Sequence, residues 1–158
     1  YETALPAALA IAGLDARIAA LEEEIARQIQ TVEGMAQRTQ RLCSAPGVGK
    51  VTALTLVSLM PELGHVNPKA AASLAGLAPM NNDSGQKRGV RSIKGGRRRV
   101  RSALYMAALG AIRASDRFRE FYQAIDLRSG SKKLAIIAVA RKLLTVLNAM
   151  ERTQKAFT

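Results

Sequence analysis

The stretch RLCSAPGVGKVTALTLVSLMPELG, residues 41–64, contains the turn around which we expect the fold to be organised. Pro46-Gly47-Val48-Gly49 holds the two residue types that most strongly interrupt regular structure, so it predicts a tight turn. Apolar residues at helical spacing follow as far as Met60, which predicts a helix that begins near Lys50. With a helix also expected before the turn, the stretch predicts a helix-hairpin-helix arrangement.

A turn of this kind suits a phosphate group. Gly47 and Gly49 lack side chains, so the backbone can approach a ligand closely. The amides at the start of the second helix favour an anion, and Lys50 adds a positive charge there. The GxxxxGK[ST] spacing of a nucleotide-binding loop is absent. An ordinary turn between two helices explains the same residues, so both interpretations stay open.

Residues 1–41, before the turn, carry a heptad pattern. One set of apolar residues is Ile11, Ile18, Ile25 and Val32, and the alternate set is Leu14, Leu21, Met35 and Leu42, with Gln28 interrupting it. This spacing predicts one long helix that forms a coiled coil. We expect the helix to associate copies of the chain into a dimer or tetramer, although it could instead pack on its own domain. The expected domains are therefore 1–41, a dimerisation helix, and 42–158, a compact helical domain.

The remaining elements are also expected to be helical. Pro68 and the preceding Asn67 predict the start of a short helix over 69–75, because proline favours the first helical position and asparagine caps helices. Further helices are expected from about residue 97, over 118–127, and over 132–157. No segment alternates apolar and polar residues as an exposed strand does. The expected fold class is all-α.

The charge is strongly positive and unevenly placed. The chain has 24 basic and 12 acidic residues, a net charge of +12. Residues 86–101 alone hold eight basic residues and no acid. A one-sided basic surface indicates a polyanionic partner, with nucleic acid first.

The single cysteine, Cys43, excludes an internal disulfide, and with the single His65 it cannot form a zinc cluster. The longest strongly apolar run, residues 134–140, is too short to span a bilayer, and no signal peptide pattern is present. We therefore expect a cytoplasmic protein with no membrane contact. Because the chain does not begin with Met, we expect it to be part of a longer protein.

The basic, glycine-rich loop is the strongest candidate for contact with nucleic acid. Its cations are Lys87, Arg88, Arg91, Lys94, Arg97, Arg98, Arg99 and Arg101. Arginine offers a planar fork that matches a phosphate with two hydrogen bonds. Four arginines at the start of a helix oppose the helix dipole, and a bound polyanion would compensate for this.

Ser84 stands just before this loop, in Asp83-Ser84-Gly85. From the residues alone, a turn residue is the simpler interpretation. The other interpretation is a nucleophile that attacks a phosphodiester whose charge the arginines neutralise. A hydrolase-type triad is not supported, because His65 is the only histidine. The carboxylates outside the first helix do not predict a metal site.

The order of four blocks resembles a known family. They are PGVGKVTALTLVSLMPELG, AASLAGLAPMNNDSGQKRG, IKGGRRRVRSALYMAALGAIR and FYQAIDLRSGSKKLAIIAVARKLLTVLNAM. Together they resemble the C-terminal transposase domain of the Piv/MooV-type DEDD transposases, the IS one-ten group of insertion sequences, over about residues 42–150. The long helix before them resembles the connecting coiled coil of that family.

The resemblance implies a role for Ser84. In the family, the serine thought to be the nucleophile of DNA strand exchange follows a Gly-Leu-x-Pro block, and Gly76-Leu77-Ala78-Pro79 precedes Ser84 here. The family's Lys-x-Gly and downstream arginine correspond to Lys94, Gly96 and Arg101. Many members read Ile-Ser-Lys before that glycine, whereas this chain reads Ser92-Ile93-Lys94, which makes Ser92 a weaker second candidate.

The resemblance also implies partners. Family members carry an N-terminal RuvC-like domain with four acidic ligands for Mg²⁺, and some use a structured RNA to choose DNA. We therefore expect no cofactor in this chain, DNA as a partner, a prokaryotic cytoplasmic protein associated with the nucleoid, and no strand exchange by this chain alone. Whether a guide RNA is a further partner stays open, because only some members use one. The alternatives are a non-catalytic nucleic-acid-binding module and a structural oligomerisation segment.

Overall fold

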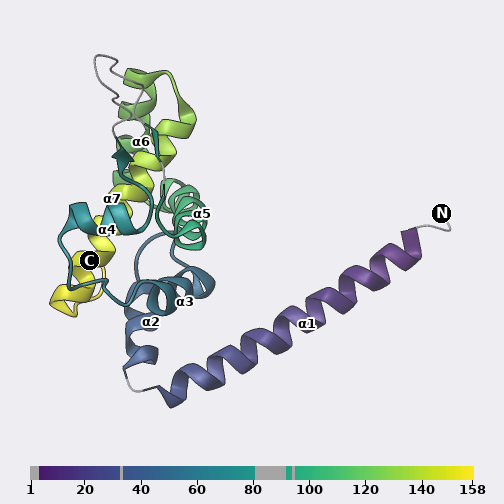
Figure 1. The fold of residues 1–158 in the computed structure, drawn as a ribbon. Coiled ribbons are helices and arrows are strands. Elements are labelled where there is room, and N and C mark those ends of the chain that lie inside the picture. Colours follow the sequence, from purple (N-terminus) through teal and green to yellow (C-terminus); the bar gives the residue numbers. More distant parts are fainter. Residues whose placement is uncertain (1–3, 33, 81–91, 94) are drawn as a thin grey trace. The chain divides into compact units, whose positions relative to one another are not determined.

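The computed structural model describes residues 4–32, 34–80, 92–93 and 95–158, and Figure 1 shows its elements along the chain. The helices are α1 (Ala4–Thr31), α2 (Met35–Cys43), α3 (Lys50–Leu59), α4 (Pro68–Leu74), α5 (Arg98–Ala114), α6 (Asp116–Ser129) and α7 (Lys132–Thr153). Two strands of two residues each, β1 (Pro79–Met80) and β2 (Ser92–Ile93), lie between α4 and α5. The all-α class is confirmed, and the small strand pair is an addition that the sequence pattern did not predict.

The heptad-bearing segment is not one continuous helix, which corrects the prediction of a single helix over residues 1–41. α1 ends at Thr31 and α2 begins at Met35. Gly34 between them has a φ of +78°, a conformation that interrupts a right-handed helix and that glycine adopts without steric cost. Leu42, expected on the coiled-coil seam, is fully buried among the residues of the compact domain.

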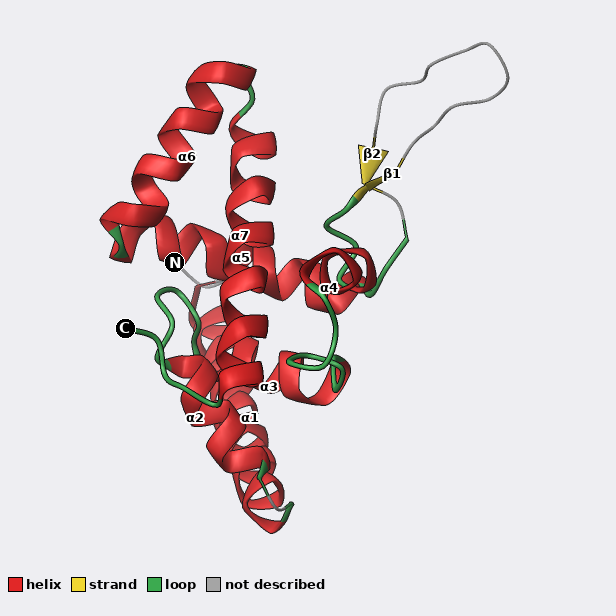
Figure 2. Cartoon of the chain, turned by 90° about the vertical axis from the view of Figure 1, so that its left-hand side faces the viewer, coloured by secondary structure: helices red, strands yellow, loops and turns green. Residues whose placement is uncertain are grey.

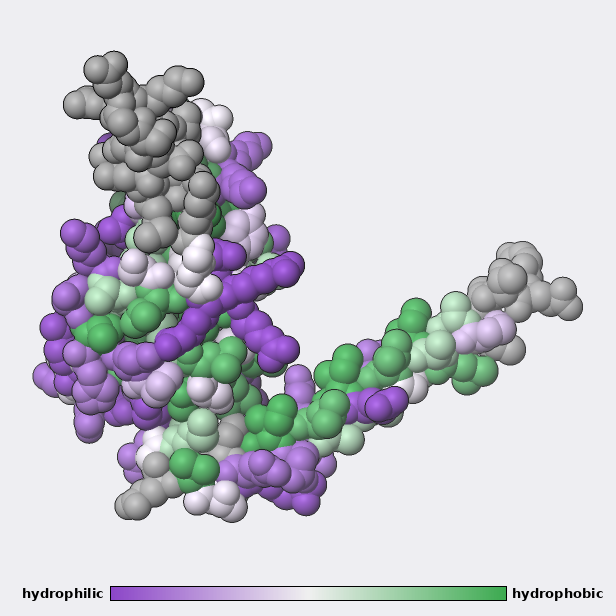
Figure 3. All heavy atoms as spheres, in the orientation of Figure 1, coloured by the Kyte–Doolittle hydropathy of each residue, from purple (hydrophilic) through white to green (hydrophobic). Residues whose placement is uncertain are grey.

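The chain divides into two compact units, residues 1–36 and 37–158, which are described separately. In the first unit, the apolar residues of α1 form an exposed stripe, and Figure 3 shows apolar side chains along this helix. The stripe consists of Ile11, Leu14, Ile18, Leu21 and Ile25, each between 45% and 60% exposed. The coiled-coil pattern thus belongs to α1, and the association of copies through it stays a prediction.

The second unit is built around α7, which packs against α4, α5 and α6, while α3 packs against α5. Among the described residues, its core consists of aliphatic and methionine side chains and the ring of Phe118. The largest fully buried residues include Leu42, Leu56, Leu63, Leu104, Phe118, Leu143 and Leu147. No helix within the described residues combines the length and the apolarity that a membrane crossing needs.

The predicted helix starts are largely observed. Asn67 caps α4, because its side chain accepts a hydrogen bond of 2.8 Å from the Ala70 amide, and Pro68 is the first helical residue. α3 begins at Lys50, as the turn and the apolar periodicity predicted. α5 begins at Arg98, next to the residue expected. Local signals therefore located these three helix ends correctly.

Two of the helix ends differ from the prediction. α6 extends from Asp116 to Ser129, beyond the predicted 118–127, and it ends only at Gly130, whose φ is +63°. α7 ends at Thr153, because Gln154 adopts a left-handed conformation with a φ of +54°. Residues 154–157, expected to be helical, therefore lie outside the helix.

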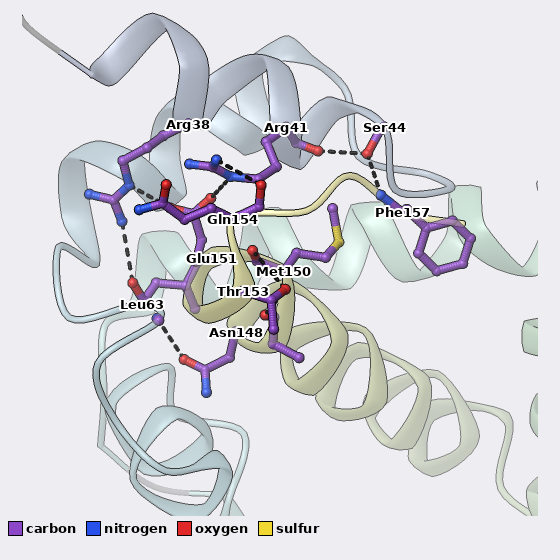
Figure 4. A network of polar contacts seen from close by, with 12 residues as sticks. Arg38, Arg41, Ser44, Leu63, Asn148, Met150, Glu151, Thr153, Gln154 and Phe157 are labelled. Carbon is purple, nitrogen blue, oxygen red and sulfur yellow. Dashed lines mark hydrogen bonds and ion pairs between the residues drawn. The ribbon is translucent and has the colours of Figure 1, made fainter.

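A buried polar network joins α2 to the end of α7 (Figure 4). The side chain of Glu151 is 3% exposed, and its two oxygens accept hydrogen bonds from Arg38 Nε at 2.5 Å and Arg41 Nε at 2.9 Å. Asn148, also buried, accepts a hydrogen bond from the Gly64 amide and donates one to the Val66 carbonyl, both at 2.8 Å. A buried carboxylate is tolerated when it is paired in this way, so the network fixes the position of α2 on the domain.

Candidate nucleic-acid interface

Part of the predicted interface can be located in the structure. Ser84, Lys87, Arg88, Arg91 and Lys94 lie outside the described residues. The described members fall into two groups, one at the start of α3 and one at the start of α5. The first group is Gly47, Gly49 and Lys50, and the second is Arg97, Arg98, Arg99 and Arg101.

The segment that carries Ser84 begins and ends at two strands that pair with each other. We call the described residues around this pair (74–80, 92–93 and 95–97) the loop base. β1 and β2 pair antiparallel, with Pro79 opposite Ile93 and Met80 opposite Ser92 (Figure 2). Below the strands, the Arg97 amide donates a hydrogen bond of 2.9 Å to the Leu74 carbonyl. The chain therefore leaves the domain and returns to it at the same place.

Two glycines allow the halves of the loop base to approach each other. Gly76 and Gly96 have φ values of +69° and +68°, which favour glycine. A Cβ on Gly96 would lie 2.3 Å from both the Cα and the nitrogen of Gly76. No side chain fits between them, so the contact is backbone against backbone. Gly96, which the family resemblance singles out, thus has a structural reason to be glycine.

Arg97 is bound to an acidic partner. Its Nη1 and Nη2 lie 2.8 Å and 2.5 Å from the two carboxylate oxygens of Glu62, in the loop between α3 and α4. The hydrogen bonds from Arg97 are the main reason that the pKa of Glu62 falls from 4.5 to about 2. In turn, the hydrogen bond to Glu62 raises the pKa of Arg97. The run of arginines in the sequence predicts Arg97 as a phosphate ligand and does not indicate this pair.

The other arginines at the start of α5 differ in their surroundings. Arg101 is half-buried, and its Nη1 donates a hydrogen bond of 2.7 Å to the Gly95 carbonyl, so it supports the loop base. Arg98 and Arg99 are exposed, and among the described residues no hydrogen-bonding or ionic partner is found for either. The first turn of α5 contains no acid. Both side chains thus lie at the positive amino end of a helix, a position that favours an anion.

At the start of α3, the three predicted residues have different roles. Gly47, with a φ of +76°, lies against α5, and a Cβ there would lie 2.2 Å from the Ala107 carbonyl oxygen. The close packing of Gly47 against the backbone of α5 therefore explains why this residue is a glycine. Gly49, the N-cap residue, and Lys50 are exposed, and nothing lies within 4 Å of a Cβ built on Gly49. The function of this turn as a nucleic-acid-binding hairpin stays a prediction.

His65, the only histidine, is exposed. Within the part of the chain that the structure describes, no three His, Cys, Asp or Glu side chains are grouped so that they could hold a metal ion.

Comparison with known proteins identifies the family. Residues 39–123, from the end of α2 into α6, match the model of the transposase IS116/IS110/IS902 family. The chain is 33% identical over 144 residues to the pilin gene-inverting protein of Moraxella bovis, covering 89% of this chain and 45% of that protein. It is 35% identical over 114 residues to the insertion element IS110 uncharacterized 43.6 kDa protein of Streptomyces coelicolor, covering 70% of this chain and 28% of that protein.

A third relative is the insertion element IS116 uncharacterized 44.8 kDa protein of Streptomyces clavuligerus, 31% identical over 147 residues, which are 92% of this chain and 36% of that protein. The chain thus spans less than half the length of these relatives. The family match includes the turn before α3, the loop base and all of α5. On these grounds the chain belongs to the IS116/IS110/IS902 transposase family.

Proposed function

We propose that this chain is the DNA-binding and nucleophile-bearing domain of a transposase or site-specific recombinase that exchanges DNA strands. Membership of a transposase family supports this proposal, as does the similarity to a protein named for inverting a pilin gene. The high net charge of +12 supports DNA as the partner.

The observation that carries the proposal is the loop base. It fixes both ends of the segment that contains Ser84, Lys87, Arg88 and Arg91, and Arg98 and Arg99 follow directly after it. Ser84 follows Met80, the last residue of β1, by only four positions. A reactive group close to a rigid support is positioned more accurately than one in a long free segment.

Ser84 is the proposed nucleophile. Its Oγ forms a bond to the phosphorus of a DNA phosphodiester, while the bond from that phosphorus to one deoxyribose oxygen breaks. Ser84 loses its hydroxyl proton in this step, and the released sugar oxygen gains a proton. The strand end is then held as a phosphoserine ester, and attack by another strand's hydroxyl reverses the step and restores Ser84.

The cations around the loop act on the phosphate. Arg98 and Arg99 stand at the amino end of α5, where the helix dipole adds to their charge. Charge that builds up on the phosphate oxygens during attack is stabilised by groups already in place. The described cations would therefore position DNA beside Ser84, together with the loop residues Lys87, Arg88, Arg91 and Lys94.

A second domain would complete the active centre. The family resemblance implies a RuvC-like domain whose four acidic residues bind Mg²⁺, outside the chain described here. Bound there, Mg²⁺ would supply charge stabilisation for the phosphoryl step. RNA carries the same phosphate groups as DNA, so a guide RNA is a second proposed partner for the basic surface.

The proposal is tested by trapping the serine ester in the full-length protein. A recombination substrate with a nick that prevents religation is incubated with the protein, which is then digested and analysed by mass spectrometry. We expect a nucleotide-bearing peptide modified at Ser84. Ser84→Ala should abolish both the adduct and strand exchange while DNA binding persists.

Ser92→Ala is the matched control, because Ser92 is the second candidate serine of the same segment. It should keep the adduct and the activity. If strand exchange continues in Ser84→Ala, Ser84 is a turn residue, and the chain is a non-catalytic nucleic-acid-binding module. An adduct on Ser92 would transfer the nucleophile to that residue.

A further inference from the structure

A groove of about 900 Å³ lies next to the loop base. Its lining includes Leu77, Pro79 and Ile93 of the loop base together with residues of α6 and α7, among them Phe121, Leu134 and Ile137. The volume is typical of sites that hold a small molecule or one part of a larger one. This groove was not anticipated from the sequence, since it depends on the packing of three separated segments.

The groove combines apolar walls with positive charge. Lys133, Arg141 and Lys142 of α7 line it, and none of its described lining residues is acidic. The Lys142 ammonium lies 4.5 Å from the centre of the Phe121 ring, so a cation and an aromatic ring are presented together. An occupant that fits this groove has an apolar, flat part and a negative charge.

Leu134 shows that the apolar lining of the groove is partly exposed and does not belong wholly to the buried core. Its side chain is 53% exposed although it stands in the first turn of α7, where the neighbouring Ala135 is fully buried. An exposed leucine alone needs no explanation. Here it adjoins a groove that also contains three cations, and that combination favours a ligand.

We infer that this groove, the nucleotide groove, binds an unpaired nucleotide of the DNA strand that is being exchanged. The inference rests on the proposed function. The base packs against the apolar wall that includes Leu134, and the phosphate faces Lys133 and Arg141. A paired base in a duplex hides its faces in the stack, so the groove distinguishes unpaired from paired DNA.

The groove also has the right position along the chain. Pro79 lines it, and Ser84 follows Pro79 by five residues, so chain length limits the distance between their Cα atoms to about 18 Å. Strand exchange requires bases next to the broken phosphodiester to leave their original partners. A site for such a base within reach of Ser84 would keep the strand from re-pairing before it is joined.

The test compares two exposed leucines in the full-length protein. Leu134→Ser removes apolar surface from the groove, whereas Leu127→Ser removes it from an α6 residue that is 93% exposed and does not line the groove. Both changes affect exposed positions, so the fold should persist in both. Binding is measured by fluorescence anisotropy for a single-stranded oligonucleotide, the same strand with abasic sites, and a duplex.

We expect the unchanged protein to bind the base-containing strand about tenfold more tightly than the abasic strand. Leu134→Ser should abolish that preference and leave duplex binding unchanged, and Leu127→Ser should preserve the preference. For single-strand binding, Lys133→Gln should lower the slope of log affinity against log salt by about 0.7 for each phosphate that the variant no longer neutralises. Lys132→Gln, the same charge change one residue earlier outside the groove, should not.

The outcomes separate this inference from the proposed function. Equal affinity of the unchanged protein for base-containing and abasic strands would overturn the nucleotide groove, even if the Ser84 adduct forms. If Leu134→Ser instead changes the molar mass in light scattering and leaves single-strand binding intact, the groove is a protein-docking site and the inference fails. Absence of the Ser84 adduct, with the base preference intact, would remove the proposed nucleophile and leave the groove standing.

Discussion

Glu62 and Arg97 show how an individual residue can have a different role from the one that its neighbours indicate. Arg97 belongs by sequence to a run of phosphate-binding candidates, but its guanidinium is held by a carboxylate that lies 35 residues earlier. Arg98 and Arg99, the next two residues, are exposed. The sequence could not make this distinction, because Glu62, which follows α3, comes close to Arg97 only when α3 packs against α5.

The pair leads to a prediction about pH. The pKa of Glu62 is lowered from 4.5 to about 2 in the folded protein. The ion pair with Arg97 therefore stabilises the folded protein in full above about pH 4.5. That contribution should be lost as the pH falls from about 4.5 to about 2, and it should be small because both side chains are about one-third exposed. Arg97→Gln should raise the pKa of Glu62 toward 4.5, as measured by NMR titration of its carboxyl carbon.

Arg98→Gln is the control, because it removes the same charge one residue along the chain without removing a hydrogen bond to Glu62. The pKa of Glu62 should then stay low. An equal rise in both variants would mean that the general positive field, and not the direct hydrogen bonds, holds the carboxyl ionised.

At the scale of elements, the packing of α3 on α5 depends on Gly47. A Cβ at Gly47 would lie 2.2 Å from two backbone atoms of α5, and its φ of +76° adds strain for any other residue. Gly47→Ala should therefore lower the free energy of unfolding by about 3 kcal/mol, as measured by urea denaturation. In the sequence, Gly47 predicted a turn. The structure adds a second reason for a glycine at this position, which is its contact with α5, about 60 residues away in sequence.

Gly49→Ala is the matched change two residues later. Gly49 has a φ of −86° and nothing within 4 Å of its Cβ, so the change should cost at most about 1 kcal/mol, the difference between these residues as N-caps. If the start of α3 also contacts phosphate, this variant should lose DNA affinity at nearly unchanged stability. Equal destabilisation by both changes would contradict the assigned role of Gly47.

The exposed stripe of α1 leads to a prediction about assembly. A helix with such an apolar face is stabilised in water when that face packs against another surface. The heptad spacing favours α1 of a second copy as that surface. We expect light scattering to give at least twice the 16.9 kDa mass of the chain at micromolar concentration. Ile18→Glu should reduce the mass to that of a monomer, because it places a charge on the seam.

Ala19→Glu adds the same charge to α1 one residue away, off the seam, and should leave the assembly intact. A monomeric unchanged chain at high concentration would refute association through α1. The break at Gly34 was not predicted from the heptads, because Met35 and Leu42 continue the apolar spacing although they belong to α2. Periodicity alone could not show that Leu42 faces the core of the compact domain.

For the whole molecule, the positive charge predicts a strong dependence of DNA binding on salt. Changing Arg98 and Arg99 together to Gln should lower the slope of log affinity against log salt by about 0.9 for each phosphate that the variant no longer neutralises. Changing the exposed Arg128 and Lys155 to Gln removes the same net charge far from the start of α5 in sequence, and it should alter the slope less. Equal changes in slope would show that DNA responds to the net charge and not to the start of α5.

The sequence predicted the fold class, most helix starts and the family correctly, because each of these depends on local pattern or on blocks of residues in order. It could not predict the Glu151 network, the bond between Glu62 and Arg97, or the nucleotide groove. Each of these joins residues from distant parts of the chain through packing. The sequence therefore predicted the candidate site as a set of cations. The structure shows that Arg97 and Arg101 are hydrogen-bonded to other residues and that Arg98 and Arg99 are exposed.

The loop base has a consequence for how this family can diversify. Gly76 and Gly96 exclude every side chain at their contact, so substitutions at either position are strongly disfavoured. The segment between β1 and β2 has both of its ends fixed at one place, so insertions and deletions there should leave the packing of the helices untouched. The same feature provides a defined pair of junctions, after Met80 and before Ser92, between which the segment could be exchanged for that of another member without redesigning the helical scaffold.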